Sequence, residues 1–137
     1  MSKQDRLRVV IADDEPRARQ FMEKLLNEHE DVEVAGVAKG GGEALALIAR
    51  HKPDAVFLDI HMPDLSGLEV ARHLKGDDAP IVVFVTAYDQ HALEAFELAA
   101  LDYVLKPIRR ERLGETVKRV RAEAAAGAKR SGNAGAV

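Results

Sequence analysis

The sequence predicts an α/β domain whose parallel β-sheet is covered by helices on both faces. Five short apolar runs alternate with five stretches in which apolar residues recur at helical spacing. Such alternation is typical of parallel strands joined by right-handed helical crossovers. The most apolar runs, residues 56–58 and 81–85, have no polar face. We therefore expect these two strands to be buried on both sides.

The first two strand-helix pairs lie in residues 7–51. Residues 7–12 are rich in β-branched side chains, and Pro16 suits the first turn of the helix that follows. That helix would end near residues 29–31 and bury an apolar face made of Ala18, Phe21, Met22, Leu25 and Leu26. Residues 32–37 alternate like an edge strand. The turn at Gly40 to Gly42 then precedes a helix that carries Leu45, Leu47 and Ile48.

The other three pairs lie in residues 55–126. The third strand ends at Asp59, and Ser66 with Glu69 forms the S-x-x-E pattern of a helix capping box. The fourth strand, residues 81–85, precedes a helix at residues 90–99. A short fifth strand, residues 103–105, precedes a long charged helix at residues 109–126.

The expected strand order is 2-1-3-4-5, the order of flavodoxin-like doubly wound folds. The second and fifth strands alternate or are short, as edge strands do, so the first, third and fourth lie inside. The domain spans residues 1–126. Residues 127–137 have too few apolar side chains to pack, so we expect a flexible linker or tail there.

Composition narrows the functional classes. With 137 residues, 47% of them apolar, the chain can build one domain core, and its net charge of -3 provides no general basic field for nucleic acid. The absence of cysteine excludes disulfides and thiolate metal sites and fits a reducing compartment. No apolar run approaches the ~18 residues that span a bilayer. We therefore expect a cytoplasmic protein without membrane attachment.

Polar groups follow four of the five strands and should meet at one edge of the sheet, because the carboxyl ends of parallel strands lie together. These groups are Asp13, Asp14, Asp59, Thr86 and Lys106. A second acidic pair, Asp77 and Asp78, precedes a strand instead. It should therefore lie at the opposite edge, where a turn explains it.

The set at the first edge predicts a metal site and phosphoryl transfer. Crowded carboxylates repel one another unless a cation joins them, and oxygen ligands favour Mg²⁺. The five histidines are too scattered in the sequence to suggest zinc. Asp59 is the expected nucleophile, with the Thr86 hydroxyl as a hydrogen-bond donor and Lys106 as a fixed positive charge. A cis Lys106-Pro107 bond would aim the amine inward, although most X-Pro bonds are trans.

Several motifs of this sequence occur together and in a fixed order. They are Asp13-Asp14, Asp59 with Met62-Pro63-Asp64 and Gly67, Thr86-Ala87, and Tyr103-Val104-Leu105-Lys106-Pro107. Jointly they resemble the receiver domain of bacterial two-component response regulators, and the match runs from Leu7 to about Arg121. The resemblance implies phosphorelay signalling, in which a sensor histidine kinase donates a phosphoryl group to the receiver.

The resemblance also implies a role for each matching residue. Asp59 would be the phosphoacceptor, and Thr86 and Lys106 would contact the phosphoryl group. Thr86 would then move toward the phosphoryl group, and Tyr103 would fill the vacated space as an aromatic switch. The Mg²⁺ ligands would be Asp13, Asp14, Asp59 and the backbone carbonyl of His61. The switch would remodel the face formed by the fourth helix, fifth strand and fifth helix and promote a homodimer.

Finer features are similar to receivers of LytTR-type transcriptional regulators. These features are Asp14-Glu15-Pro16 and residues 86–96 and 101–108. In that family a β-rich DNA-binding domain follows the receiver, and DNA would be contacted only through it. This chain stops before such a domain would fit, so it is either truncated, which we favour, or a stand-alone receiver.

Two further classes remain as alternatives. A small aspartate-nucleophile phosphatase of the haloacid dehalogenase type uses similar residues, but it opens with a D-x-D motif, and residue 15 here is Glu. A constitutive interaction module with a vestigial acidic site would not respond to Mg²⁺. We expect a receiver that catalyses its own phosphorylation and dephosphorylation and is not an enzyme acting on a separate substrate.

Overall fold

The computed structural model describes residues 6–136, with side chains described as far as residue 127. It contains one parallel sheet of five strands in the order β2-β1-β3-β4-β5. The strands are β1 (Leu7–Ala12), β2 (Val32–Ala38), β3 (Ala55–Leu58), β4 (Ile81–Thr86) and β5 (Asp102–Leu105). The predicted fold class and strand order are confirmed.

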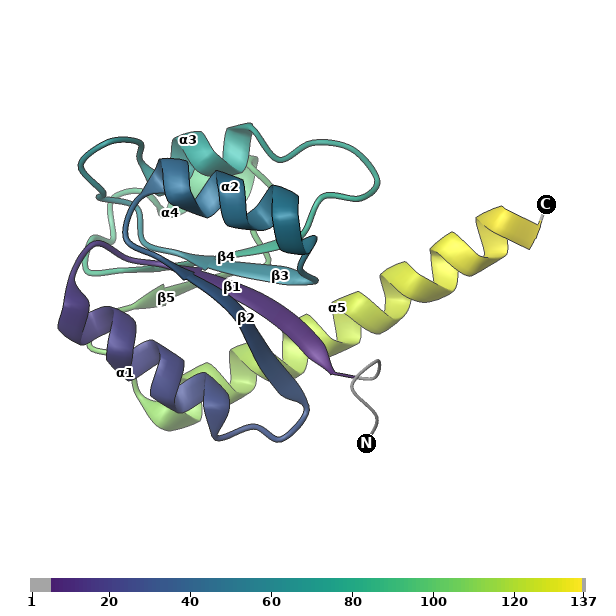
Figure 1. Cartoon of the computed structure of the whole chain (residues 1–137), viewed down its shortest axis with the longest axis horizontal. Coiled ribbons are helices and arrows are strands. Elements are labelled where there is room, and N and C mark those ends of the chain that lie inside the picture. The colour runs from purple at the N-terminus through teal and green to yellow at the C-terminus, as the bar shows by residue number, and fades with distance from the viewer. Residues whose placement is uncertain (1–5, 137) are drawn as a thin grey trace.

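Helices cover both faces of the sheet (Figure 1). Helices α1 (Pro16–Asn27) and α5 (Arg110–Ala136) lie on one face, and α2 (Gly41–His51), α3 (Gly67–Arg72) and α4 (Ala92–Glu97) lie on the other. Among the described residues, no helix combines the length and the apolar character needed to cross a membrane.

Successive side chains of a strand point to opposite faces of the sheet, and helices cover both faces (Figure 1). The central strands are therefore apolar throughout. Phe57 packs in the layer under α1 and α5, whereas its neighbours Val56 and Leu58 pack in the layer under α2, α3 and α4. All three are fully buried. Two cores therefore hold β3 in place, and the residue that follows it is positioned by both.

Helix α1 buries three of the apolar residues expected on its inner face, Met22, Leu25 and Leu26. Phe21 was expected there too, but its side chain is 42% exposed. It lies at the margin of the apolar face, about 100° around the helix from Met22 and about 140° from Leu26. Phe21 instead lines an open pocket with Pro107 and Ile108.

Helix α4 is shorter than the sequence predicted. It occupies Ala92–Glu97 rather than residues 90–99, and its C-cap is Leu98. The next residue, Ala99, has a left-handed backbone with φ of 61°. A left-handed residue just past the C-cap ends a helix, which explains the early stop.

Helix α5 is longer than predicted, because the sequence placed its end at residue 126. The helix runs to Ala136 and extends away from the sheet (Figure 1). Low apolar content had suggested a loose tail, but residues 127–136 contain no proline that would break a helix, although Gly127, Gly132 and Gly135 each cost about 1 kcal/mol relative to alanine. Val137 and residues 1–5 lie outside the described residues. The domain boundary at residue 126 and the linker role of the tail stay predictions.

Asp77 and Asp78 lie at the edge opposite to the one where the strands end. With Asp54, which precedes β3, and Ile81, which begins β4, they line a surface hollow. This placement confirms that the second acidic pair is separate from the first.

Asp102, the first residue of β5, fastens that strand to α5. Arg112 donates two hydrogen bonds to its carboxylate, at 2.9 and 2.8 Å, and the Thr116 hydroxyl donates a third at 2.7 Å. Burial raises the pKa of Asp102, but the hydrogen bonds from Arg112 and Thr116 outweigh that effect and hold the pKa well below its usual range. Asp102 therefore stays ionised and keeps α5 on the sheet.

We expect Asp102→Asn to lower the free energy of unfolding by about 2 kcal/mol at pH 7, because charge-assisted hydrogen bonds are lost. The lowered folded-state pKa means that this stabilisation is complete above the ordinary Asp pKa of 3.8 and fades as the pH falls below it. Urea unfolding followed by circular dichroism should show the gap between wild type and variant closing in acid. Glu28→Gln is the control, because it weakens an exposed ion pair between the end of α1 and Arg110 of α5. It should lower the free energy of unfolding far less. Equal losses in both variants would contradict this role.

Candidate functional site

Three carboxylates meet where the central strands end. The Asp13 N–H donates to the carbonyl of Ala38, and the Asp59 N–H donates to the carbonyl of Ala12, so both residues continue the strand pairing past β1 and β3. One carboxylate oxygen from each of Asp13, Asp14 and Asp59 lies within 4.8 Å of the others. Asp13 and Asp59 are buried and Asp14 is exposed. The predicted convergence of these acids is confirmed.

Lys106 supplies a positive charge between two of these acids. Its Nζ donates to Asp13 Oδ2 at 2.7 Å and to Asp59 Oδ2 at 3.1 Å. Its backbone N–H donates to the carbonyl of Thr86, which keeps β4 and β5 paired past the end of β5. The Lys106-Pro107 bond is cis. The sequence assigned the neutralising cation to a metal alone, whereas the structure shows that an ammonium group already joins Asp13 to Asp59.

Burial and pairing act together on the ionisation of this cluster. Burial raises the pKa of Asp13, although the hydrogen bonds from Lys106 and from the Glu15 N–H lower it in part. Burial lowers the pKa of Lys106, but its bonds with Asp13 and its attraction to Asp59 outweigh this and raise it. Lys106 therefore stays cationic at neutral pH, and the carboxylate of Asp13 is costly to bury without a cation nearby.

The acidic group fits a hard divalent cation. All three side chains offer oxygen, and Asp14 faces solvent, which leaves room for water ligands. Mg²⁺ prefers one or two carboxylates together with water or phosphate oxygens. In the part of the chain that the structure describes, no other three acidic or histidine side chains lie close enough together to hold a metal.

The two predicted switch residues both contact Tyr88. Thr86 is fully buried, and its Oγ1 accepts a long hydrogen bond of 3.5 Å from the Tyr88 N–H. The hydroxyl of Tyr103 donates to the carbonyl of Tyr88. The Tyr103 ring lies 6.4 Å from that of Phe84 and is half-buried. Thr86 is thus at the predicted edge, with its hydroxyl toward the loop that follows β4.

His61 and Tyr88 were expected to flank the site, but the sequence did not indicate that their rings pack together there or that His91 joins them. The imidazole of His61 packs edge-on against Tyr88 with centroids 4.1 Å apart, and the ring of His91 lies 5.3 Å from His61. The histidines looked scattered because residues 61 and 91 are far apart in sequence. Both follow strand ends, however, and that topological signal could have placed them at the same edge.

Known proteins resemble this chain over most of its length. A family model described as the response regulator receiver domain matches residues 9–118. Transcriptional regulatory protein BtsR of Salmonella typhi is 44% identical over 117 residues, which cover 85% of this chain and 49% of the relative. An uncharacterized response regulatory protein of Vibrio cholerae is 50% identical over 114 residues, covering 83% of this chain and 48% of the relative. The chain thus spans about half the length of the curated relatives it matches.

Solved structures agree with these matches. The response regulatory domain of mrkE from Klebsiella pneumoniae is 36% identical with a TM-score of 0.77, covering 89% of this chain and 98% of that one. The REC domain of AraT, a response regulator from Geobacillus stearothermophilus, is 35% identical with a TM-score of 0.77, covering 85% and 94%. With the strand order 2-1-3-4-5 and the acidic edge, these matches establish that the chain belongs to the response regulator receiver domain family.

Proposed function

We propose that this receiver accepts a phosphoryl group on Asp59 from a sensor histidine kinase in the cytoplasm and thereby controls dimerisation and transcription. Membership of the receiver family implies phosphorelay signalling and a histidine kinase partner. The single observation that carries the residue-level proposal is the position of Lys106, whose ammonium reaches Asp13 and Asp59 at 2.7 and 3.1 Å beside the exposed Asp14.

Asp59 is held in an orientation suited to a nucleophile. Its Oδ1 accepts the N–H of Ile60 at 2.7 Å, and its Oδ2 accepts Lys106. In the proposed step a bond forms between an Asp59 oxygen and phosphorus while the bond from phosphorus to the imidazole nitrogen of the kinase breaks. Lys106 would then balance the negative charge of the phosphoryl oxygens, and the Thr86 hydroxyl would donate to one of them.

Asp13, Asp14 and Asp59 would hold Mg²⁺, with the backbone carbonyl of His61 as a further ligand. The ion, when bound, supplies positive charge that offsets the charge developing on the phosphoryl oxygens. The fit rests on the oxygen-only donor set and on the raised pKa of the buried Asp13 carboxyl, an environment that favours a neighbouring cation.

The switch would act through Tyr88. Phosphorylation adds about -1.5 to -2 charges at Asp59 and should draw in the Thr86 hydroxyl. That hydroxyl now accepts the Tyr88 N–H, and the Tyr88 carbonyl accepts the Tyr103 hydroxyl. Movement of Thr86 would therefore disturb both contacts and free the Tyr103 ring to turn inward.

The face formed by α4, β5 and α5 is the proposed dimer surface. Helix α4 exposes Leu93 by 72% and Phe96 by 77%, and β5 exposes Leu105 by 47%. Exposed large apolar side chains that lie close together are typical of interaction surfaces. A symmetric dimer would bury the same patch on each copy.

The transcriptional part of the proposal comes from the relatives. In proteins named transcriptional regulatory protein BtsR, the part that matches this chain is 49% of the length. We propose a following DNA-binding domain of the LytTR type, through which alone the protein would contact DNA. A stand-alone receiver is the alternative output.

We do not expect turnover of a separate substrate. The match to the receiver family over residues 9–118 supports self-phosphorylation over an aspartate-nucleophile phosphatase. Steady release of inorganic phosphate from a phosphomonoester would favour the phosphatase. The absence of any binding response to Mg²⁺ or beryllofluoride would favour an interaction module with a vestigial site.

With acetyl phosphate and Mg²⁺, the wild type should take up about one phosphoryl group per chain, and Asp59→Asn should take up none, because the amide cannot act as the nucleophile. Intact-protein mass spectrometry measures both. Asp77→Asn, at the opposite edge of the sheet, should label like the wild type. Full labelling of Asp59→Asn would remove the basis of this proposal.

Beryllofluoride with Mg²⁺ should convert the wild type to a dimer, and Phe96→Glu should prevent this by placing a charge at the most exposed large apolar side chain of α4. Sedimentation velocity distinguishes the two states. Phe21→Glu is the matched control, since it changes an exposed phenylalanine of α1, a helix on the opposite face of the sheet from α4 (Figure 1). Dimerisation of Phe96→Glu as strong as that of the wild type would rule out this surface.

A further inference from the structure

The loop between β3 and α3 is held firmly at its two ends. The N–H of Gly67 donates to the Ile60 carbonyl at 2.8 Å, and Ser66 caps α3 by accepting the Glu69 N–H at 3.1 Å. A Cβ at residue 67 would lie 2.1 Å from the carbonyl oxygen of Asp59, so the two ends of the loop touch. This loop carries the proposed nucleophile and the proposed carbonyl ligand of His61.

The middle of the loop is held by one carboxylate. Asp64 Oδ1 accepts the N–H of Gly41 at 3.0 Å, and Oδ2 accepts the N–H of Gly42 at 2.9 Å. These are the first two residues of α2, whose N–H groups have no partner inside a helix. Gly40 stands at the N-cap without a side chain that could serve them. Asp64 therefore caps a helix from another loop.

The glycines of this turn permit the contact. A Cβ at Gly41 would lie 2.5 Å from the backbone oxygen of Leu65, and a Cβ at Gly40 would lie 2.7 Å from Asp64 Oδ1. A side chain at Gly41 would therefore displace the backbone of the loop, and one at Gly40 would displace the Asp64 carboxylate. The segment from Gly40 to Gly42 looks like an ordinary turn in the sequence. In the structure it packs against the loop that follows β3.

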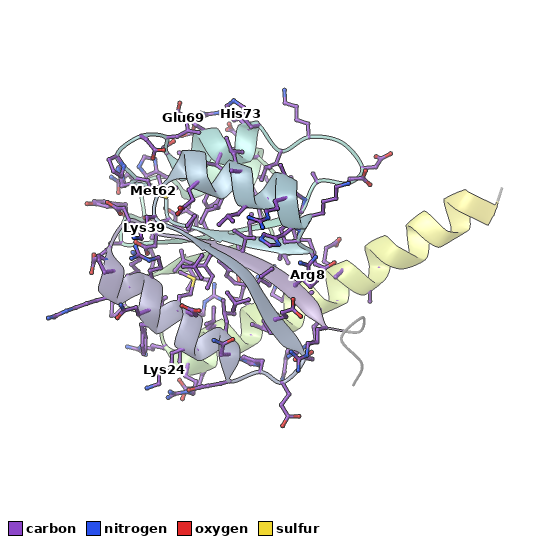
Figure 2. All side chains as sticks on the ribbon, viewed as in Figure 1. Arg8, Lys24, Lys39, Met62, Glu69 and His73 are labelled. Carbon is purple, nitrogen blue, oxygen red and sulfur yellow. The ribbon has the colours of Figure 1, made fainter. Side chains whose placement is uncertain are left out.

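Charge strengthens the contact. The hydrogen bonds from the Gly42 and Gly41 N–H groups lower the pKa of Asp64, so its carboxylate is ionised at neutral pH. A negative charge at the first turn also interacts favourably with the helix dipole. Met62 and Lys39, from the two loops, lie at the same edge of the sheet, whereas Arg8 lies toward the other end of β1 (Figure 2).

We propose that Asp64 is a positioning residue for the phosphoacceptor site, because it clamps the loop that carries the metal ligands onto the N-terminus of α2. Ile60 and Met62 anchor the first part of the loop by burial, but the side chains of Pro63 and Asp64 are exposed. The Asp64 clamp thus holds the segment directly after the His61-Met62 peptide. This inference rests on the proposed function, since it assumes that the site binds Mg²⁺.

Loss of the two Asp64 hydrogen bonds should lower the affinity for Mg²⁺ and leave the domain folded. We expect Asp64→Ala to raise the Mg²⁺ concentration for half-maximal acetyl-phosphate labelling about tenfold, the lower end of the effect of outer-shell partners on metal sites. The rate at saturating Mg²⁺ should stay close to that of the wild type. Asp64→Asn keeps one acceptor oxygen and should lie between the two, which also provides a reading if Asp64→Ala folds poorly.

Ser66→Ala is the matched control, because it also removes a helix cap from the same loop but breaks no bond to α2. Thermal unfolding should show a similar loss of stability in Asp64→Ala and Ser66→Ala, while only the Asp64 variants lose Mg²⁺ affinity. An unchanged Mg²⁺ requirement in both Asp64 variants, or an equal shift in Ser66→Ala, would overturn the inference and leave the proposed function intact. If neither the labelling nor the amide NMR spectrum of the wild type changes when Mg²⁺ is added, both the proposed metal site and this inference are overturned.

Discussion

The contact of the Lys106 ammonium with Asp13 and Asp59 is the interaction on which the candidate site depends. Asp13 is fully buried, and an isolated buried carboxylate would lose several kcal/mol of hydration. Lys106 compensates this loss with bonds of 2.7 and 3.1 Å to the two acids. The same ammonium leaves Asp14 free to face solvent. The two buried acids thus have a cationic partner within the fold itself.

Sheet order determines how this contact can form. Strand β5 lies two positions from β3 and three from β1, and neighbouring strands are about 4.8 Å apart. A cation that starts at the end of β5 must therefore reach across the end of β4. A long side chain such as Lys106 can do so, and the small Thr86 lies at the end of the strand that it crosses. The Lys106 side chain is long enough to span the distance between these strands, and the Thr86 side chain is small enough to let it pass.

Much of this arrangement could be predicted because hydropathy reveals where buried strands end. That signal separated Asp13 and Asp14 from Asp77 and Asp78, although the two pairs have the same composition. Contacts made by side chains across loops were not visible. Asp64 and Gly41 are 23 residues apart, and each is explained locally as a turn residue. The length of α5 was misjudged because low apolar content was weighed above the absence of a helix-breaking proline after residue 126.

In the proposed function Asp59 takes the phosphoryl group, and Lys106 exchanges its bond to Asp13 for one to that group. A crystal structure with Mg²⁺ and beryllofluoride, a stable mimic of the phosphoryl group, tests this directly. We expect beryllium bonded to one carboxylate oxygen of Asp59, the metal bound by Asp13, Asp14 and Asp59, and Lys106 Nζ within hydrogen-bond distance of a fluorine. Beryllofluoride bound elsewhere, or Lys106 still bonded to Asp13 with the adduct in place, would contradict it.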